Sequence, residues 1–110
     1  MTMFDDRERA EEHRFIQQRE LPFRIAARRN RLLGLWAAER LGLTGEAATG
    51  YAQRLVVAEA TSPGEDALVQ KVACDLEAHG YWPAAAEVAE HLRHYAAEAA
   101  RELGEEIASA

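Results

Sequence analysis

The sequence predicts an all-α protein, an antiparallel four-helix bundle preceded by a mobile N-terminal arm. Three features of the 110 residues support this class. Alanine, leucine, glutamate and arginine dominate, and all four favour helices. Apolar residues recur at steps of three and four within segments separated by glycine and proline. No alternating run of β-branched and aromatic residues, the pattern expected of a strand, is found.

The first bundle helix is predicted over about residues 22–41. Its apolar positions are Leu21, Ile25, Leu32, Leu33, Trp36 and Leu43. Gly42 is expected to end it, because glycine is common just past a helix. Thr44 can then cap a second helix that runs to about residue 60. The short loop between them favours antiparallel neighbours.

The strongest local signal starts the third helix. Ser62 is a suitable N-cap, Pro63 occupies the first helical position and Glu65 completes a capping box. This helix is expected to end near Gly80. Its apolar positions are Leu68, Val69, Val72 and Leu76.

Pro83 is expected to open the fourth helix. One apolar stripe follows it, formed by Val88, Leu92, Tyr95, Ala99 and Leu103. The steps of three and four residues keep these side chains on one helix face. The fourth helix therefore has a side that can face a bundle core.

Residues 1–20 differ from the predicted bundle, residues 21–110. Half of them are charged, and the face that Phe4 and Phe15 would share on a helix is too thin to hold the segment to a core. Isolated helices of this length are marginal in water. We therefore expect an arm that is disordered or fraying when free and helical when bound to a partner.

Pro22 supports a boundary between arm and bundle, since proline disfavours helix at the preceding residue. The alternative is one continuous helix from about residue 5 to residue 41, kinked at Pro22. The charge balance also changes along the chain: residues 1–31 have a net charge of +2 and residues 32–110 of −8. Such asymmetry is typical of an interaction arm beside a solvated body, and ordinary surface variation is the alternative.

Composition excludes several classes of protein. The single cysteine, Cys74, cannot form an internal disulfide, and we expect it to be a small buried apolar residue. The N-terminus lacks the apolar core of a signal peptide, and no stretch approaches the roughly 20 apolar residues that span a bilayer. We expect a cytoplasmic protein. Trp36 and Trp82 are interpreted as core or lid aromatics, Trp82 packing over one bundle end.

Catalytic and metal sites are not predicted. His91 and His94 follow Glu87 and Glu90 by four residues, but a metal site would need a matching motif on a second helix. A solvated face is the better interpretation, so no metal and no cofactor are expected. Without a glycine-rich phosphate loop or a nucleophile–histidine–acid set, the chain is not expected to be an enzyme.

A basic cluster allows two interpretations. Its members are Arg24, Arg28, Arg29, Asn30 and Arg31. They could form an anion-binding face for nucleotide or nucleic acid. The acidic balance of the domain and the absence of interleaved aromatics favour instead ion pairs with acids of neighbouring helices. Nucleic acid is therefore not an expected partner, and weak nucleotide contact stays open.

Several blocks in order resemble the inhibitory zeta subunit family of bacterial F-type ATP synthases. The run Phe4-Asp5-Asp6-Arg7-Glu8-Arg9-Ala10 is similar to the N-terminal signature of that family, and residues 27–38 are similar to its central motif. Further blocks follow over 41–45, 51–57, 63–66 and 71–76. The similarity covers about residues 3–80. Separated blocks in the right order are more specific than a single short motif.

The resemblance implies a four-helix bundle whose mobile arm enters the catalytic head of the ATP synthase, between a catalytic and a non-catalytic subunit near the rotor shaft. The arm would fold there and block rotation in the direction of ATP hydrolysis. The protein would then be peripherally membrane-associated through the ATP synthase, without inserting into the membrane. On this carry-over the partner-binding residues are Phe4, Asp5, Asp6, Arg7, Glu8, Arg9, Arg14, Phe15 and Arg19.

Overall fold

The computed structural model describes residues 3–62 and 64–109, with the side chains of all of these except residues 3–8 and 13–18. The described residues form four helices and no strand. They are α1 (Met3–Arg40), α2 (Gly45–Thr61), α3 (Glu65–Ala78) and α4 (Ala85–Ser109). The predicted all-α class is therefore confirmed for this part of the chain.

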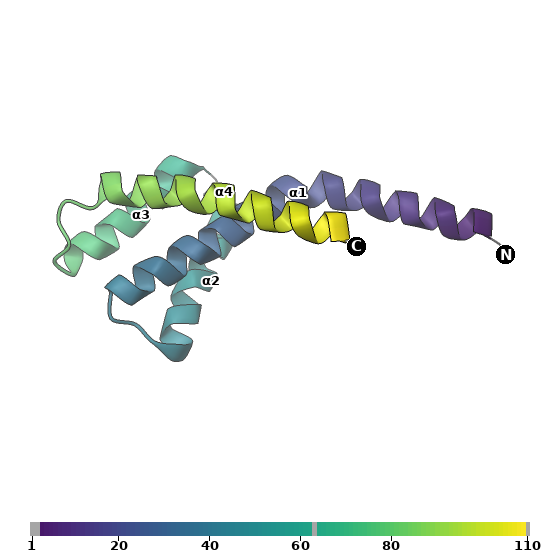
Figure 1. Cartoon of the computed structure of the whole chain (residues 1–110). Helices are drawn as coiled ribbons and strands as arrows, with labels where there is room; N and C mark the ends of the chain where they lie inside the picture. The colour runs from purple at the N-terminus through teal and green to yellow at the C-terminus, as the bar shows by residue number, and fades with distance from the viewer. Residues whose placement is uncertain (1–2, 63, 110) are drawn as a thin grey trace.

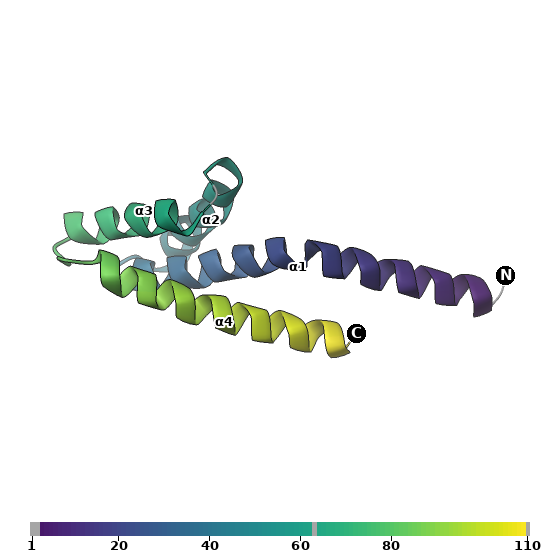
Figure 2. The ribbon, with the colours of Figure 1, turned by 90° about the horizontal axis from the view of Figure 1, so that it is seen from above.

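α1 is the central helix of the molecule. It packs against both α2 and α4, and α3 packs mainly on α4. Figures 1 and 2 show that α4 runs antiparallel to α1 and to α3, whereas α2 crosses α1 obliquely. The molecule is elongated, 62 × 27 × 24 Å, because the first half of α1 extends beyond the other helices (Figure 2).

α1 continues through Pro22, which lies inside the helix. The expected helix start near residue 22 is therefore wrong, and the continuous alternative describes the backbone. Figures 1 and 2 show the axis changing direction between the purple and blue parts of α1. Proline is the usual cause of such a bend, because it removes one backbone hydrogen bond and its ring clashes with the preceding turn. The division into arm (1–20) and bundle (21–110) stays a prediction.

Two helices end in the same way, at glycine. Leu43 N–H donates to the Ala38 carbonyl at 2.9 Å, and Gly42, with φ +75°, follows the last turn of α1. Tyr81 N–H donates to the Leu76 carbonyl at 2.9 Å, and Gly80 has φ +101°. Both sets of bonds form a Schellman motif, in which glycine adopts the left-handed conformation without steric cost. The predicted ends at Gly42 and near Gly80 are confirmed.

The predicted start of α3 is wrong in detail. Ser62 is the C-cap of α2, because its N–H donates to the Ala58 carbonyl at 2.8 Å and α2 extends to Thr61. Gly64 occupies the N-cap position of α3, without a side-chain cap. Pro63 lies outside the described residues. Thr44 does precede α2 as its N-cap, but its side chain makes no capping hydrogen bond.

The core is formed by the predicted apolar stripes. Its buried side chains include Leu33, Tyr51, Leu55, Leu68, Val72, Leu76, Val88, Leu92 and Leu103. Trp36 packs against this core as expected. Two expectations fail. Cys74 is exposed, because Val72, Ala73 and Leu76 occupy the core side of α3, and Trp82 is 75% exposed on the α3–α4 connection and does not cover the bundle end.

The contact between α1 and α2 depends on Gly34. A Cβ atom added there would lie 2.6 Å from the Ala52 Cα and 3.0 Å from the Ala52 Cβ. Both residues are buried. Small residues on both helices thus allow the two backbones to approach closely, and this fixes where α2 crosses α1.

Candidate partner-binding surface

The first half of α1 extends beyond the other helices (Figure 2). A helix rises about 1.5 Å per residue, so the 38 residues of α1 are roughly 57 Å long, close to the long dimension of the molecule. Among its described side chains, residues 9–12, 19 and 20 are exposed. The segment is therefore available to a partner along the described part of its length.

The predicted arm residues fall into two groups. Arg9 and Arg19 lie on this projecting half of α1 and are exposed. The others have side chains outside the described residues; they are Phe4, Asp5, Asp6, Arg7, Glu8, Arg14 and Phe15. Their role stays a prediction.

Among the side chains of α1 that the structure describes, Leu21 is the first that is half-buried. One turn further on, Arg24 Nη2 lies 3.6 Å from a carboxylate oxygen of Glu106 on α4. The C-terminal end of α4 thus marks the point at which α1 leaves the body.

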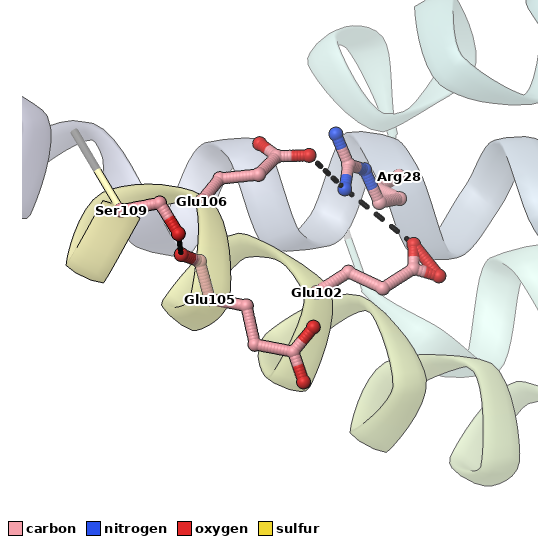
Figure 3. Close-up of a pocket in the computed structure, with 5 residues that line it drawn as sticks. All are labelled: Arg28, Glu102, Glu105, Glu106 and Ser109. Carbon is pink, nitrogen blue, oxygen red and sulfur yellow. Dashed lines mark hydrogen bonds and ion pairs between the residues drawn. The ribbon is translucent and has the colours of Figure 1, made fainter.

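Arg28 connects α1 to the last turns of α4. Its Nη1 donates to Glu106 Oε1 at 2.8 Å and to Glu102 Oε2 at 3.4 Å, and Figure 3 shows the guanidinium between the two carboxylates. The hydrogen bond to Glu106 is the main reason that the pKa of Arg28 is raised above its usual value. These residues border a hollow of about 520 Å³.

Arg29 and Asn30 belong to a buried polar cluster at the α1–α2 crossing. Arg29 Nε donates to Asn30 Oδ1 at 2.9 Å, and its Nη2 lies 3.4 Å from Glu59 Oε2. Asn30, which has no exposed surface, donates from Nδ2 to the Leu55 carbonyl and to Glu59, both at 3.2 Å. All polar atoms of Asn30 are satisfied, as buried polar groups require.

The predicted basic cluster therefore does not form one continuous anion-binding face. Arg24 and Arg28 pair with α4, Arg29 and Asn30 point into the α1–α2 contact, and Arg31 is exposed. A phosphate group at this face would compete with the carboxylates already paired there.

The acidic partners of these arginines were missed by sequence reasoning. They are Glu59, Glu65, Glu102 and Glu106. Glu102 and Glu106 are four residues apart, so they lie on one face of α4. That spacing was visible in the sequence, but which arginine they would meet was not.

A shallow apolar groove lies beside the point where α1 leaves the body. Phe23, which is 77% exposed, forms one side of it. The groove measures about 460 Å³, and we call it the Phe23 groove; it is lined by Phe23, Ala26, Ala27, Val56, Glu59 and Ala60. Sequence reasoning missed it, because the residues come from two helices and only Phe23 is a large apolar side chain off the core stripe.

The histidines of α4 take part in local contacts. The His91 ring stacks on Trp36 with a centroid distance of 4.0 Å, and His94 Nε2 lies 3.5 Å from a carboxylate oxygen of Glu98. Within the described residues, no group of three or more histidine, cysteine or acidic side chains is arranged to hold a metal ion. Nor does any described helix combine the length and apolarity needed to cross a membrane.

Comparison with known proteins assigns the family. No curated protein and no solved structure matches the chain significantly. The sequence profile of the family described as ATPase inhibitor subunit zeta matches residues 1–102, nearly the whole chain. The family suggested by the sequence blocks is thereby confirmed: the chain belongs to the ATPase inhibitor subunit zeta family.

Proposed function

We propose that this chain inhibits ATP hydrolysis by the F-type ATP synthase and does so with residues 1–20. The segment would enter the catalytic head between a catalytic and a non-catalytic subunit, near the rotor shaft, and block rotation in the hydrolytic direction. The four-helix body would remain outside the catalytic head and hold the arm in position. The family match supports the inhibitory role.

The observation that carries the proposal for the arm is the projection of the first half of α1 beyond the body. A helix that leaves its own domain with exposed side chains at residues 9–12, 19 and 20 offers a long surface to a partner. Mixed charges along it suit forked hydrogen bonds from arginine to carboxylates. Large apolar side chains such as Phe4 and Phe15 would act as anchors, because a few buried aromatics dominate most interfaces.

On this proposal the protein is a regulator and not an enzyme. Its partners would be the catalytic and non-catalytic subunits and the shaft. It would be cytoplasmic and associated with the membrane only through the ATP synthase. Recognition of nucleotide or nucleic acid by the basic cluster is less well supported, since Arg24, Arg28 and Arg29 already contact carboxylates.

Deletion of residues 1–20 tests the proposal. ATP hydrolysis by the ATP synthase of the same cells, stripped of this subunit, is measured at rising amounts of the full chain and of the truncated chain. We expect the full chain to inhibit and the truncated chain to have no effect. Arg28→Ala with Arg31→Ala serves as the comparison, because it removes two of the four arginines of the basic cluster and leaves the arm intact.

The fold of the truncated chain must be checked at the same time. Circular dichroism should show a helical protein that unfolds cooperatively, since the core residues lie between Leu33 and Leu103. Full inhibition by the truncated chain would contradict the proposed role of residues 1–20 as the inhibitory segment. Loss of inhibition only in the double arginine variant would favour the basic cluster instead.

A further inference from the structure

The Phe23 groove is an apolar surface left uncovered by the protein. Four large hydrophobic residues among those described are exposed, and Phe23 is the most exposed of them at 77%. Ala26 and Ala27 follow it on α1, and Val56 and Ala60 face them from α2. Exposed apolar surface of this kind often marks an interaction site.

The chemistry of the groove selects an apolar occupant. Its one charged lining residue is Glu59, whose carboxylate already contacts Arg29 and Asn30. The other lining side chains are one aromatic, one valine and three alanines. Small side chains between two helices leave room for the side chains of a third helix, as in other helix-in-groove complexes.

Position in the chain selects the partner. Phe23 follows Arg19, the last of the predicted partner-binding residues, by four positions, and a helix rises about 1.5 Å per residue, or roughly 6 Å over that distance. α1 is continuous across this interval. A protein that encloses the arm up to Arg19 therefore reaches the mouth of the groove without any further movement of the body.

We propose that the Phe23 groove is a second contact surface for the catalytic head, and that it receives the apolar side of a helix at the rim of the site the arm enters. This inference rests on the proposed inhibitory function. The arm would block the motor, and the groove would set how tightly the body is held against it. Loss of the groove should weaken binding and leave the block itself intact.

The test uses two full-length variants with changes on different helices. Phe23→Gln removes the exposed ring from α1 and keeps a good helix former. Ala60→Arg fills the groove from α2, with a cation that suits the C-terminal end of that helix. Because Ala60 lies on α2, its substitution leaves the sequence of α1 and of the arm unchanged.

Matched controls lie at the opposite end of the molecule. Trp82→Gln removes an aromatic that is 75% exposed, and Ala78→Arg adds arginine at the last residue of α3. Figure 1 shows the α3–α4 connection at the end of the molecule away from the N-terminus. Helix content and melting temperature, measured by circular dichroism, should be the same for all four variants and the wild type.

Inhibition of ATP hydrolysis is then titrated on the stripped ATP synthase. We expect each groove variant to need roughly tenfold more protein for half-maximal inhibition, with the same maximal inhibition as the wild type. The two controls should match the wild type. Wild-type potency in Ala60→Arg would overturn the groove, even if Phe23→Gln were weakened, because an effect confined to α1 belongs to the arm.

The two proposals fail in different ways. If the wild-type chain leaves hydrolysis unchanged at saturation, the proposed function is overturned. If both groove variants inhibit as well as the wild type, the proposed role of the arm is retained and only the proposed role of the groove is overturned.

Discussion

The two halves of α1 are one continuous helix but differ in what stabilises them. The second half buries Asn30, Leu33, Ala37 and Ala38 against the body. In the first half, residues 9–12, 19 and 20 are exposed. Because most helical stability in proteins comes from tertiary packing, the core stabilises the second half, whereas the exposed residues of the first half add little packing.

This difference separates stability from binding along a single helix. Substitutions in the second half should change the free energy of unfolding. Substitutions in the first half should change the interaction with the ATP synthase and leave the body folded. A helix of this kind can present a binding segment at a fixed direction from a rigid body, with Pro22 near the junction.

Gly34→Ala tests the packed half most severely. The new Cβ would lie 2.6 Å from the Ala52 Cα, a backbone atom that cannot rotate away, so α1 and α2 must separate. We expect a loss of about 3 kcal/mol in the free energy of unfolding, measured by urea denaturation. Gly104→Ala is the control: no atom lies within 4 Å of its added Cβ, and alanine should stabilise α4 by about 0.5–1 kcal/mol. Equal effects at the two glycines would refute the close crossing.

Asn30→Ala tests the buried polar cluster. The substitution leaves the Leu55 carbonyl and the Glu59 carboxylate without the Asn30 donor, and it removes the acceptor for Arg29 Nε. We expect the free energy of unfolding to fall by about 2 kcal/mol, because unsatisfied buried polar groups are costly. Gln53→Ala, an exposed amide on α2, should change it little. Unfolding of Asn30→Ala at the wild-type urea midpoint would show that the cluster adds no net stability.

Phe4→Ala and Phe15→Ala test the projecting half. If these side chains anchor the arm in the catalytic head, each substitution should raise the amount of protein needed for half-maximal inhibition by about tenfold. The urea midpoint should stay that of the wild type, which is the reverse of the result expected for Gly34→Ala. Gln17→Ala, a change of an uncharged polar residue in the same segment, is the control. Unchanged inhibitory potency in both variants would show that the Phe4 and Phe15 side chains do not anchor the arm.

Much of the local structure could be predicted from the sequence. Four members of the predicted stripe, Val88, Leu92, Ala99 and Leu103, are buried and the fifth, Tyr95, is half-buried, because helical periodicity is a property of consecutive residues. Predictions were less secure where a residue has two local roles. Ser62 was expected to start α3, but its N–H completes the last turn of α2.

The candidate site could be predicted only in part. Family blocks indicated the arm, but the Phe23 groove was missed, since its lining comes from residues 23–27 on α1 and residues 56–60 on α2. The basic cluster was recognised as a group of side chains, but its division between α4 and the α1–α2 contact was not. The charge of a residue does not show which way its side chain points. Neighbouring positions on a helix point about 100° apart, so Arg28 and Arg29 contact different partners.

The sequence by itself determined the helical class, the apolar stripe of each bundle helix, the glycines that end α1 and α3, and the family. These follow from composition, from periodicity along consecutive residues and from ordered blocks. Only the tertiary structure decided that α1 passes through Pro22 as one helix, that Gly34 meets Ala52, that Arg28 pairs with Glu106, and that an apolar groove is left open beside Phe23. Each of these depends on which distant surfaces pack together. The packing of whole helix faces decides those contacts, and no local run of residues encodes it.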